Sequence, residues 1–574
     1  MMLPRMTDTT RRAERLAPWF VGALFAAPML IAKYPPMVDL PLHEASVGLL
    51  RHWGDPVFAP KGLYFLNLGH SNQLFSLLVF AVSFLVPIGT ASKVVVAAAM
   101  LALPLATARF ADHVGASRWT VALVAAPIGF GWLFFWGLVQ NIVGLIALLA
   151  LLPTIDRFAA EPTARRAAAV CAAMVLLHFA HQAMQLVACA ALVFCTVGTP
   201  LRPRALTLRV APLLFSVALV YVAGVYAWRH AGPRNLRMPA LIFYEEFGQK
   251  VTSISAVLFG GYEPWVRNSM LALALAPIAI LAAGRPRPGP ITESFWERLH
   301  AWRFEALGVS LIILYLVAPT SVRSTTLVYH RFMPTAWALL AVCCAARPGR
   351  PDASVPRIVP VLCAVLPIAS ILAAWPSFAD SNRMYSDLEV LVDRIEPGCA
   401  VAALNLGHDS ANRLWNPIEA MGHVVAERGG RSLFDYTQSP ISPVAQRPEK
   451  EWADVVDRTQ RLPFAFRPAW DMTRFRYLLV DTPDRALAAA LTLGMRRDAR
   501  FVAAKGDWYL FESILPLVPI DADDASPPQP RPPSLRVLLR NTVKEIQAAE
   551  NGTGPIPEIP LESDDIVKNR SASP

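Results

Sequence analysis

Long apolar runs separated by short polar segments fill the first 375 residues of the chain. A membrane-spanning helix needs about 17–25 mostly apolar residues, and only helices suit such runs because lipid offers the backbone no hydrogen-bond partners. The pattern therefore predicts a polytopic α-helical membrane protein embedded in a lipid bilayer. The runs lie near residues 17–37, 72–88, 92–110, 118–136, 141–155, 167–181, 183–198, 210–228, 269–284, 305–319, 332–346 and 358–375.

The arginine residues limit how many of these twelve runs cross the membrane. Cytoplasmic loops are rich in Lys and Arg, and the basic amino terminus, residues 1–16, is expected in the cytoplasm as part of an uncleaved signal anchor. Four later loops are also rich in arginine, and all of them lie on the cytoplasmic side only if about 11 runs cross. Run 72–88 is expected to dip into the membrane and return, although two weak spans merging elsewhere would satisfy the same parity. The four loops are 156–166, 199–209, 285–303 and 347–357.

The same parity predicts which polar segments share the extracytoplasmic side. They are the outer loop 34–71, the turn 137–140, the corner 181–182, the loops 229–268 and 320–331, and everything after residue 376. On that side we expect Asp39, His43, Gln140, Asn141, His178, His181, Glu245, Glu246, Arg323, His330 and Arg331 to converge.

After residue 375 the apolar runs stop. Strand-like and helix-like segments alternate over 376–515, which predicts a small extracytoplasmic α/β domain beyond the transmembrane domain 17–375. Residues 516–574 are Pro-rich and polar, so a disordered tail is expected. Within it, residues 534–550 carry a helical apolar stripe that could dock on a partner, lie on the membrane surface or do nothing.

Composition narrows the class of protein further. Residues are 54% hydrophobic and 17% charged, which fits a membrane protein. The net charge of +10 is explained by the cytoplasmic loops, so nucleic-acid binding is not expected. The seven cysteines form no C-x-x-C pair, and no nucleotide-binding loop occurs. Zinc sites, a disulfide framework and ATP-driven transport are therefore not indicated.

Asp39 and His43 stand one helical turn apart, directly after the first apolar run. Asp39 could simply cap the helix that follows. The same spacing places both side chains on one face, where they could hold a proton, a divalent metal or a metal–pyrophosphate pair. Ionisable groups at a membrane boundary often mark function. We therefore take both as catalytic candidates, with Asp39 as a general base.

Other polar residues of the predicted outer side have two interpretations each. His178 and His181 would share a helix face, either as hydrogen-bonded bundle residues or, together with His43, as a metal or phosphate site. Gln140 and Asn141 could cap the span that begins there or bind substrate. For the loop 229–268, which carries Glu245 and Glu246, we consider an amphipathic helix on the outer leaflet or a substrate-cavity lining.

Arg323, His330 and Arg331 run against the positive-inside trend. A guanidinium suits bidentate contact with a phosphate, so these three side chains are candidates for binding a lipid-phosphate group. Anchoring at the membrane interface is the alternative.

Four stretches of the sequence resemble motifs of one group of bacterial membrane proteins. VDLPLHEA resembles the D-x-P-x-H-x-A first outer loop of uncharacterised bacterial membrane proteins of the GT-C glycosyltransferase type. Three further motifs of that group are matched in the same order. They are FFWGLVQNIVGLIALLALL at 134–152, LLHFAHQAMQL at 176–186 and YHRFMP at 329–334.

The resemblance implies an enzyme of the bacterial inner membrane that takes a sugar from a polyprenyl-phosphate donor. An acid of the first outer loop would be the catalytic acid/base, and Asp39 is the matching position. The acceptor would be a glycan, lipid or protein. Leu40 follows Asp39 where several enzymes of this type have a second acid. Some enzymes of this type also need an acid in a later outer loop, and Glu245 or Glu246 could serve there. The alternative function is a non-catalytic lipid-glycan transporter or scaffold in envelope polysaccharide assembly.

Overall fold

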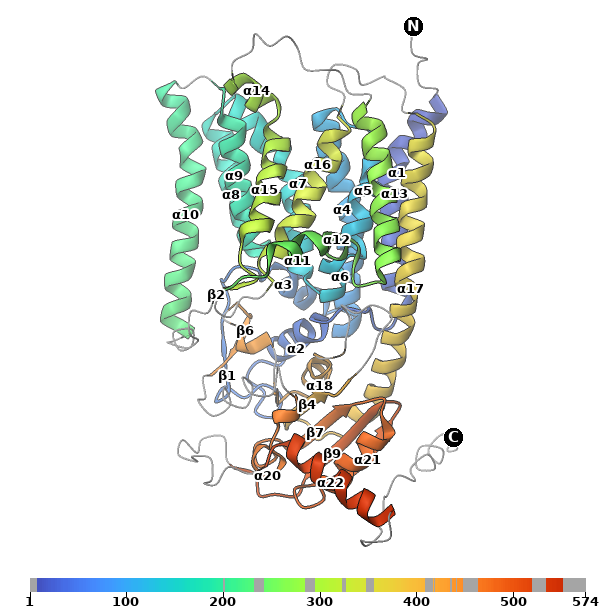
Figure 1. The fold of residues 1–574 in the computed structure, drawn as a ribbon. Coiled ribbons are helices and arrows are strands. Elements are labelled where there is room, and N and C mark those ends of the chain that lie inside the picture. Colours follow the sequence, from blue (N-terminus) through green and yellow to red (C-terminus); the bar gives the residue numbers. More distant parts are fainter. Residues whose placement is uncertain are drawn as a thin grey trace. The chain divides into compact units, whose positions relative to one another are not determined.

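The computed structural model divides into two compact units (Figure 1). Unit 1 comprises residues 1–37, 67–379 and 411–415, and unit 2 comprises residues 38–66, 380–410 and 416–574. The residues that the structure describes are 8–199, 202–231, 242–283, 295–322, 327–346, 356–407, 417, 419–433, 436–439, 441–447, 463–518 and 533–550.

Unit 1 is a bundle of helices, and each of the twelve apolar runs contains one. Its longer helices are α1 (Asp8–Ile31), α4 (Ile88–Val114), α7 (Val139–Ala160), α8 (Ala164–Ala180), α9 (Gln182–Thr196), α10 (Pro203–Ala231), α13 (Pro264–Ala283), α15 (Arg303–Val317), α16 (Phe332–Cys344) and α17 (Ile358–Val392), which continues into unit 2. Its shorter helices are α3 (Leu74–Val82), α5 (Thr120–Gly129), α6 (Trp132–Trp136), α11 (Phe247–Thr252), α12 (Ile254–Phe259), α14 (Phe295–Ala301) and the 3-10 helix η2 (Tyr329–Arg331).

The helical, multi-pass membrane prediction is confirmed. Within the described residues, six helices are long and apolar enough to cross a membrane, or seven if the bent pair α14–α15 counts as one span. The eleven-span count stays a prediction, because several of the apolar helices are too short to be counted as spans by length alone. The run 72–88 contains α3, whose nine residues extend about 14 Å at 1.5 Å per residue. That is shorter than a bilayer core of about 30 Å.

The two ends of unit 1 differ in their loops. The described amino-terminal residues, α14 and the start of α10 lie at one end, which carries arginine-rich segments (Figure 1). The segments α3, α11 and α12 lie toward the other end, together with the strand pair β2 (Ile242–Phe243) and β3 (Ser321–Val322). Loops far apart in sequence therefore share an end of the bundle.

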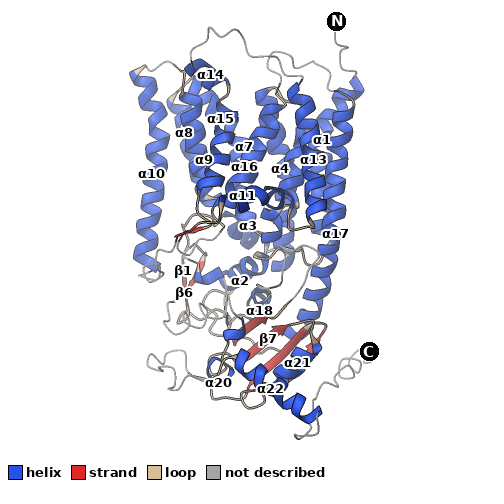
Figure 2. Cartoon of the chain, in the orientation of Figure 1, coloured by secondary structure: helices blue, strands red, loops and turns tan. Residues whose placement is uncertain are grey.

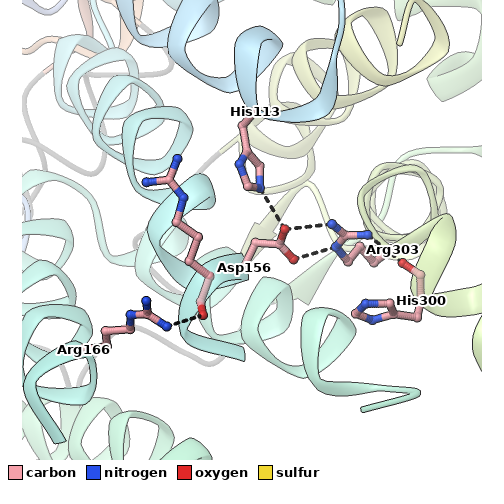
Figure 3. A network of polar contacts seen from close by, with 6 residues as sticks. His113, Asp156, Arg166, His300 and Arg303 are labelled. Carbon is pink, nitrogen blue, oxygen red and sulfur yellow. Dashed lines mark hydrogen bonds and ion pairs between the residues drawn. The ribbon is translucent and has the colours of Figure 1, made fainter. Parts of the chain in front are cut away.

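A saturated ion-pair network ties three helices together at the arginine-rich end (Figure 3). Asp156 of α7 is buried and binds Arg303 of α15 through two hydrogen bonds of 2.6 and 2.7 Å. His113 of α4 contacts the same carboxylate, with Nε2 at 2.7 Å from Oδ2. Arg303 also donates to the carbonyl of His300. We call His113, Asp156 and Arg303 the Asp156 network.

Unit 2 contains a five-stranded sheet in the order β5-β4-β7-β9-β8, and Figure 2 shows it as the main group of strands. The sheet is parallel through β5, β4 and β7 and antiparallel from there to β8, with β8 and β9 forming a hairpin. The strands are β4 (Ala400–Asn405), β5 (Arg431–Ser432), β7 (Tyr477–Asp481), β8 (Ala499–Lys505) and β9 (Trp508–Ser513). The accompanying helices are α2 (Leu40–Arg51), α18 (Met421–Arg428), α20 (Pro468–Asp471), α21 (Arg485–Gly494) and α22 (Leu535–Glu550), and the 3-10 turns are η3 (Tyr436–Gln438) and η4 (Pro463–Ala465).

The predicted tail helix packs on its own domain. Leu535 and Leu539 of α22 are buried in the apolar core of unit 2. The amide of Leu535 donates to the carbonyl of Phe466 at 2.6 Å, and Thr542 lies against Gly494 of α21. The side of α22 that carries Leu535 and Leu539 therefore packs against the domain to which the helix belongs.

The first loop belongs to the same unit as the sheet, although it follows α1 directly in sequence. Residues 38–66 include α2 and the strand β1 (Tyr64–Leu66). The strand pairs antiparallel with β6 (Val444–Gln446) from the carboxyl-terminal part of the chain. Chain order therefore does not coincide with the division into units.

Candidate functional site

Asp39 stands at the amino end of α2, in the N-cap position. Its φ and ψ of −84° and −6° are helical, and its side chain makes no capping hydrogen bond. Pro41 occupies the first turn, where its missing N–H costs no helical bond. The predicted helix is therefore present, but the capping interpretation of the Asp39 carboxylate is wrong. This half-buried carboxylate lies near the positive end of the helix dipole.

His43 lies one turn after Asp39 and is almost completely buried. Its ring stands edge-on to Tyr436, with centroids 4.7 Å apart. Burial lowers the pKa of His43 to about 3, because the charged ring would lose its hydration. His43 is therefore neutral at physiological pH and is suited to hydrogen bonding within unit 2 rather than to holding positive charge.

Glu44 forms a contact that the sequence did not suggest. Its Oε2 lies 3.1 Å from Nδ1 of His423 on α18, and both side chains are largely buried. The ring of His423 is also edge-on to Tyr385 at 4.7 Å. No local sequence signal joins Glu44 to His423, because the two residues meet only through the tertiary fold.

The expectation that His178 and His181 share one helix face is wrong. The helix ends at Ala180 and a new one begins at Gln182, while His181 between them is extended with φ −165° and ψ 116°. The sequence placed a corner at 181–182, and the break lies there. The amide of Gln182 donates to the side-chain Oδ1 of Asn72 at 2.8 Å, which supplies one of the acceptors that a new helix end requires.

The hydrogen bonds assign different protons to the two histidines. Gln185 donates through Nε2 to Ser216, so its Oε1 accepts from Nδ1 of His178 at 3.0 Å. Arg331 donates to Nε2 of His181 at 3.2 Å, which leaves the proton of a neutral His181 ring on Nδ1. Among the described residues, neither His178 Nε2 nor His181 Nδ1 has a hydrogen-bond partner.

α7 packs against His181 at Gly144, one turn after Asn141. A Cβ at Gly144 would lie only 2.5 Å from the Cβ of His181, and Asn141 is on the same face of α7, one turn earlier. Asn141 is buried, and both polar atoms of its side chain lack partners among the described residues. The expected cap role of Asn141 is therefore wrong, because α7 begins after Leu138 without a side-chain cap. Gln140 is also buried in this first turn.

His330 and Arg331 occupy η2, immediately before α16. The ring of His330 stacks on Trp132, with centroids 4.7 Å apart. Burial, with help from the charges of Arg331 and Lys250, lowers the pKa of His330 to about 3. Its Nδ1 is buried without a partner among the described residues. We call Asn141, His181, His330 and Arg331 the His181 cluster.

Lys250 is a charged residue beside this cluster that the sequence did not single out. Its side chain is buried, and Nζ donates to the carbonyls of Leu316 and Ala318 at 3.0 and 2.5 Å. The ammonium thus satisfies carbonyls at the end of α15, where positive charge is favoured. It also lies 4.7 Å from the centre of the Tyr329 ring. The Lys250 ammonium is therefore stabilised by the carbonyl end of α15 and by the Tyr329 ring.

The two acids of the loop 229–268 behave differently. Glu245 is half-buried and accepts a hydrogen bond from the hydroxyl of Tyr329. Glu246 is exposed in the N-cap position of α11 and makes no capping bond. Glu245 is therefore the acid that the fold brings to η2. Arg323 lies outside the described residues.

The structure brings Asn141, His181, His330 and Arg331 to one end of unit 1, with Glu245 beside them. Asp39 and His43 belong to unit 2, where their neighbours are residues of α18 and η3. Within the residues that the structure describes, no group of three or more His, Cys, Asp or Glu could hold a metal ion. A metal role for His178 and His181 would need additional ligands and stays a prediction.

Chemically, the His181 cluster suits an oxygen-rich anion. It combines the Arg331 guanidinium with buried ring and amide groups that have polar atoms without partners among the described residues. Buried polar atoms are normally satisfied, and each unsatisfied one costs about 1–3 kcal/mol. A bound phosphate would accept hydrogen bonds from such donors.

No family model matches the chain, and no curated protein matches it. Among solved structures the chain is similar to ArnT from Cupriavidus metallidurans bound to undecaprenyl phosphate, with a TM-score of 0.48, 12% identity, and coverage of 89% of this chain and 100% of that chain. It is also similar to the Archaeoglobus fulgidus oligosaccharyltransferase in complex with zinc and sulfate, with a TM-score of 0.37, 10% identity, and coverage of 81% and 68%. Likenesses this distant assign no function, so the residues of this chain have to carry the assignment.

Proposed function

We propose that this protein is a membrane glycosyltransferase of the GT-C type, which transfers a sugar from a polyprenyl-phosphate donor to an extracytoplasmic acceptor. The observation that carries the proposal is the position of Asp39 and the absence of a capping hydrogen bond to its carboxylate. This acid matches the acid/base position of the D-x-P-x-H-x-A loop, and it stands at a helix start without capping it. A half-buried carboxylate that is not used as a cap is suited to accept a proton.

In the proposed reaction, the Asp39 carboxylate removes the proton of an acceptor hydroxyl. The hydroxyl oxygen bonds to the anomeric carbon of the sugar while the bond from that carbon to the phosphate oxygen breaks. The electron pair of the broken bond stays on the polyprenyl phosphate. Asp39 then returns the proton to solvent.

The leaving phosphate gains negative charge in this step, and Arg331 is proposed to stabilise it. Preorganised charge contacts of this kind lower a barrier most in a site that excludes water. Asn141 Nδ2 and His181 Nδ1 are proposed to donate to the same phosphate, since both are buried without a partner among the described residues. Arg323 is proposed as a second cation for the same group.

The test uses the full-length protein in nanodiscs with a panel of radiolabelled polyprenyl-phosphate sugars. Wild type is compared with Asp39→Asn, which keeps the size of the side chain. We expect wild type to turn over a donor and the variant to lose about 10²–10⁴-fold in kcat, the usual contribution of a general base. The matched control is Asp55→Asn, since Asp55 lies in the same loop and accepts hydrogen bonds from the amides of Val57 and Phe58.

Equal loss in both variants would assign a structural role to Asp39 and contradict the proposal. Binding of a lipid-linked sugar without turnover in wild type, unchanged by Asp39→Asn, would instead identify a transporter or scaffold.

A further inference from the structure

The carboxyl-terminal part of the chain holds the backbone of the first loop. The amide of Gly430 donates to the carbonyl of Phe58 at 3.0 Å. The hydroxyl of Tyr64 donates to the carbonyl of Gly430 at 2.6 Å in a buried contact. β1 also pairs with β6, with Tyr64 opposite Gln446. The loop that contains Asp39 thus takes much of its structure from residues far along the chain.

α18 crosses α2 at backbone contact distance. A Cβ at Gly422 of α18 would lie 2.4 Å from the carbonyl carbon and oxygen of Pro41 and 2.7 Å from the amide nitrogen of Leu42. A Cβ at Gly48 of α2 would lie 3.1 Å from the carbonyl oxygen of Ala426. The atoms in contact at Gly422 are backbone atoms, which cannot rotate away as a side chain could. Any side chain at position 422 would therefore push on the first turn of α2.

That first turn is the turn in which Asp39 stands. The carbonyl of Asp39 accepts hydrogen bonds from the amides of Leu42 and His43, at 3.1 and 3.2 Å. Gly422 thus packs closely against a turn that is hydrogen-bonded directly to the backbone of Asp39. A displacement there moves the carboxylate.

The Glu44–His423 contact fixes the two helices at a second point. Their closest atoms are 3.1 Å apart, and the side chains of Glu44 and His423 are only 5% and 16% exposed. A buried carboxylate is stable only with a close partner. The pairing therefore favours one register of α2 along α18, one turn from Asp39.

We propose that α18 is a positioning element for catalysis, with Gly422 and His423 as positioning residues that set the place of Asp39. The inference rests on the proposed function. It assigns to the α/β domain a role in holding the reacting loop, in addition to the acceptor binding that such a domain could provide.

The first experiment is Gly422→Ala, with Gly506→Ala as the matched control. Gly506 has a φ of +58° in the turn between β8 and β9, and the three atoms nearest to a Cβ there all belong to the side chain of Asp387. Both variants strain unit 2, but only one strains α2. We expect Gly422→Ala to lower kcat about 10–100-fold with the donor KM unchanged, because a shift of about 1 Å can cost 10²-fold. Gly506→Ala should leave kcat within about twofold.

Hydrogen exchange gives a readout that does not need turnover. The amides of Leu42 and His43 should exchange faster in Gly422→Ala and at the wild-type rate in Gly506→Ala. Unchanged exchange in Gly422→Ala would overturn the inference even if no donor is turned over. A wild type without turnover, combined with the expected exchange, would remove the proposed function and leave only the structural coupling.

The second experiment is a double-mutant cycle of Glu44→Gln and His423→Leu, measured in kcat. Residues that act as one unit show non-additive effects. Each single change should lower kcat about tenfold or more, and the double variant should be no worse than the worse single variant. Additive effects, or single variants with wild-type kcat, would overturn the inference. Because these changes place no new atoms against Pro41, they test the inference even if Gly422→Ala fails to fold.

Discussion

The two buried polar groups of unit 1 contrast in how completely their atoms are satisfied. In the Asp156 network, both carboxylate oxygens have donors, and the Arg303 guanidinium binds that carboxylate bidentately and a carbonyl as well. In the His181 cluster, at the other end of the bundle, buried atoms of Asn141 and His181 have no partner within the described chain. Both groups lie in an apolar protein, yet only the first is complete.

The difference teaches how to tell a structural ion pair from a binding group. In a fully satisfied network the interactions already contribute to the stability of the folded protein. Removing one partner is destabilising because it leaves a buried charge without its counter-ion. An unsatisfied buried group costs free energy, which a ligand can recover. The two groups should therefore respond in opposite ways when they are altered.

The largest expected effect is on stability, at the Asp156 network. Asp156→Ala leaves the mostly buried Arg303 without its carboxylate, so we expect a loss of up to about 3–5 kcal/mol in the free energy of unfolding. Thermal unfolding of the purified protein measures it, while turnover per folded molecule should not change. The matched control is Asp112→Ala, whose exposed pair with Arg118 should contribute about 0–1 kcal/mol. Equal losses would remove the contrast between this network and surface charge.

The next effect is on turnover, at the His181 cluster. Arg331→Met removes the guanidinium that we assign to the donor phosphate, and we expect kcat to fall about 10²–10³-fold. Stability should fall by only about 1–3 kcal/mol, because buried His181 Nε2 loses a donor. Arg166→Met is the control, since the pair of Arg166 with Glu161 is exposed at the arginine-rich end. A large stability loss in Arg331→Met with normal turnover would place Arg331 in the same class as Arg303.

Asn141 offers a sharper form of the comparison. Asn141→Leu removes buried polar atoms that have no partner among the described residues, so the protein should gain about 1–2 kcal/mol in stability while turnover falls. Gln185→Leu is the matched change at a satisfied amide, which bonds His178 and Ser216, and it should lose about 1–3 kcal/mol. Chemical or thermal unfolding of both variants checks the signs. Destabilisation by Asn141→Leu would show that this amide is satisfied after all.

An effect of similar size to that of Asn141→Leu is a pH dependence at His330. The pKa of His330 is lowered to about 3 from about 6.5 in an unfolded chain. The stability from keeping this ring neutral is therefore present above pH 6.5 and is lost as pH falls toward 3. Between pH 8 and pH 5, wild type should lose about 2 kcal/mol more than His330→Phe, which keeps the stacking on Trp132 but cannot titrate. Identical pH profiles for the two proteins would contradict the burial of a neutral ring.

Local patterns in the sequence predicted the helices better than they predicted the site. Apolar runs identified every long helix of unit 1, because burial in lipid or protein depends on composition over about 20 residues. The corner at 181–182 was visible as a polar interruption. The prediction that His178 and His181 share a helix face was wrong, because the helix breaks between them. Spacing rules hold only within one helix.

Partner choice inside the candidate site could not be read from the sequence. Lys250 was not singled out in the sequence, but its ammonium donates to carbonyls at the end of α15. Glu44 was not singled out either, but it contacts His423 of a distant helix. The apolar stripe around Leu535 was open to a partner or a membrane, but Leu535 is buried in its own domain.

The sequence alone therefore determined that this chain is a helical membrane protein, and it singled out Asp39 and Arg331 as unusual for their places. These conclusions depend on hydropathy and charge, which are summed along the chain. Only the tertiary structure decided that loop 38–66 belongs with the carboxyl-terminal segment, and that Asp156 is satisfied while Asn141 is not. Those outcomes depend on contacts between distant residues, whose energies arise only when the chain has folded.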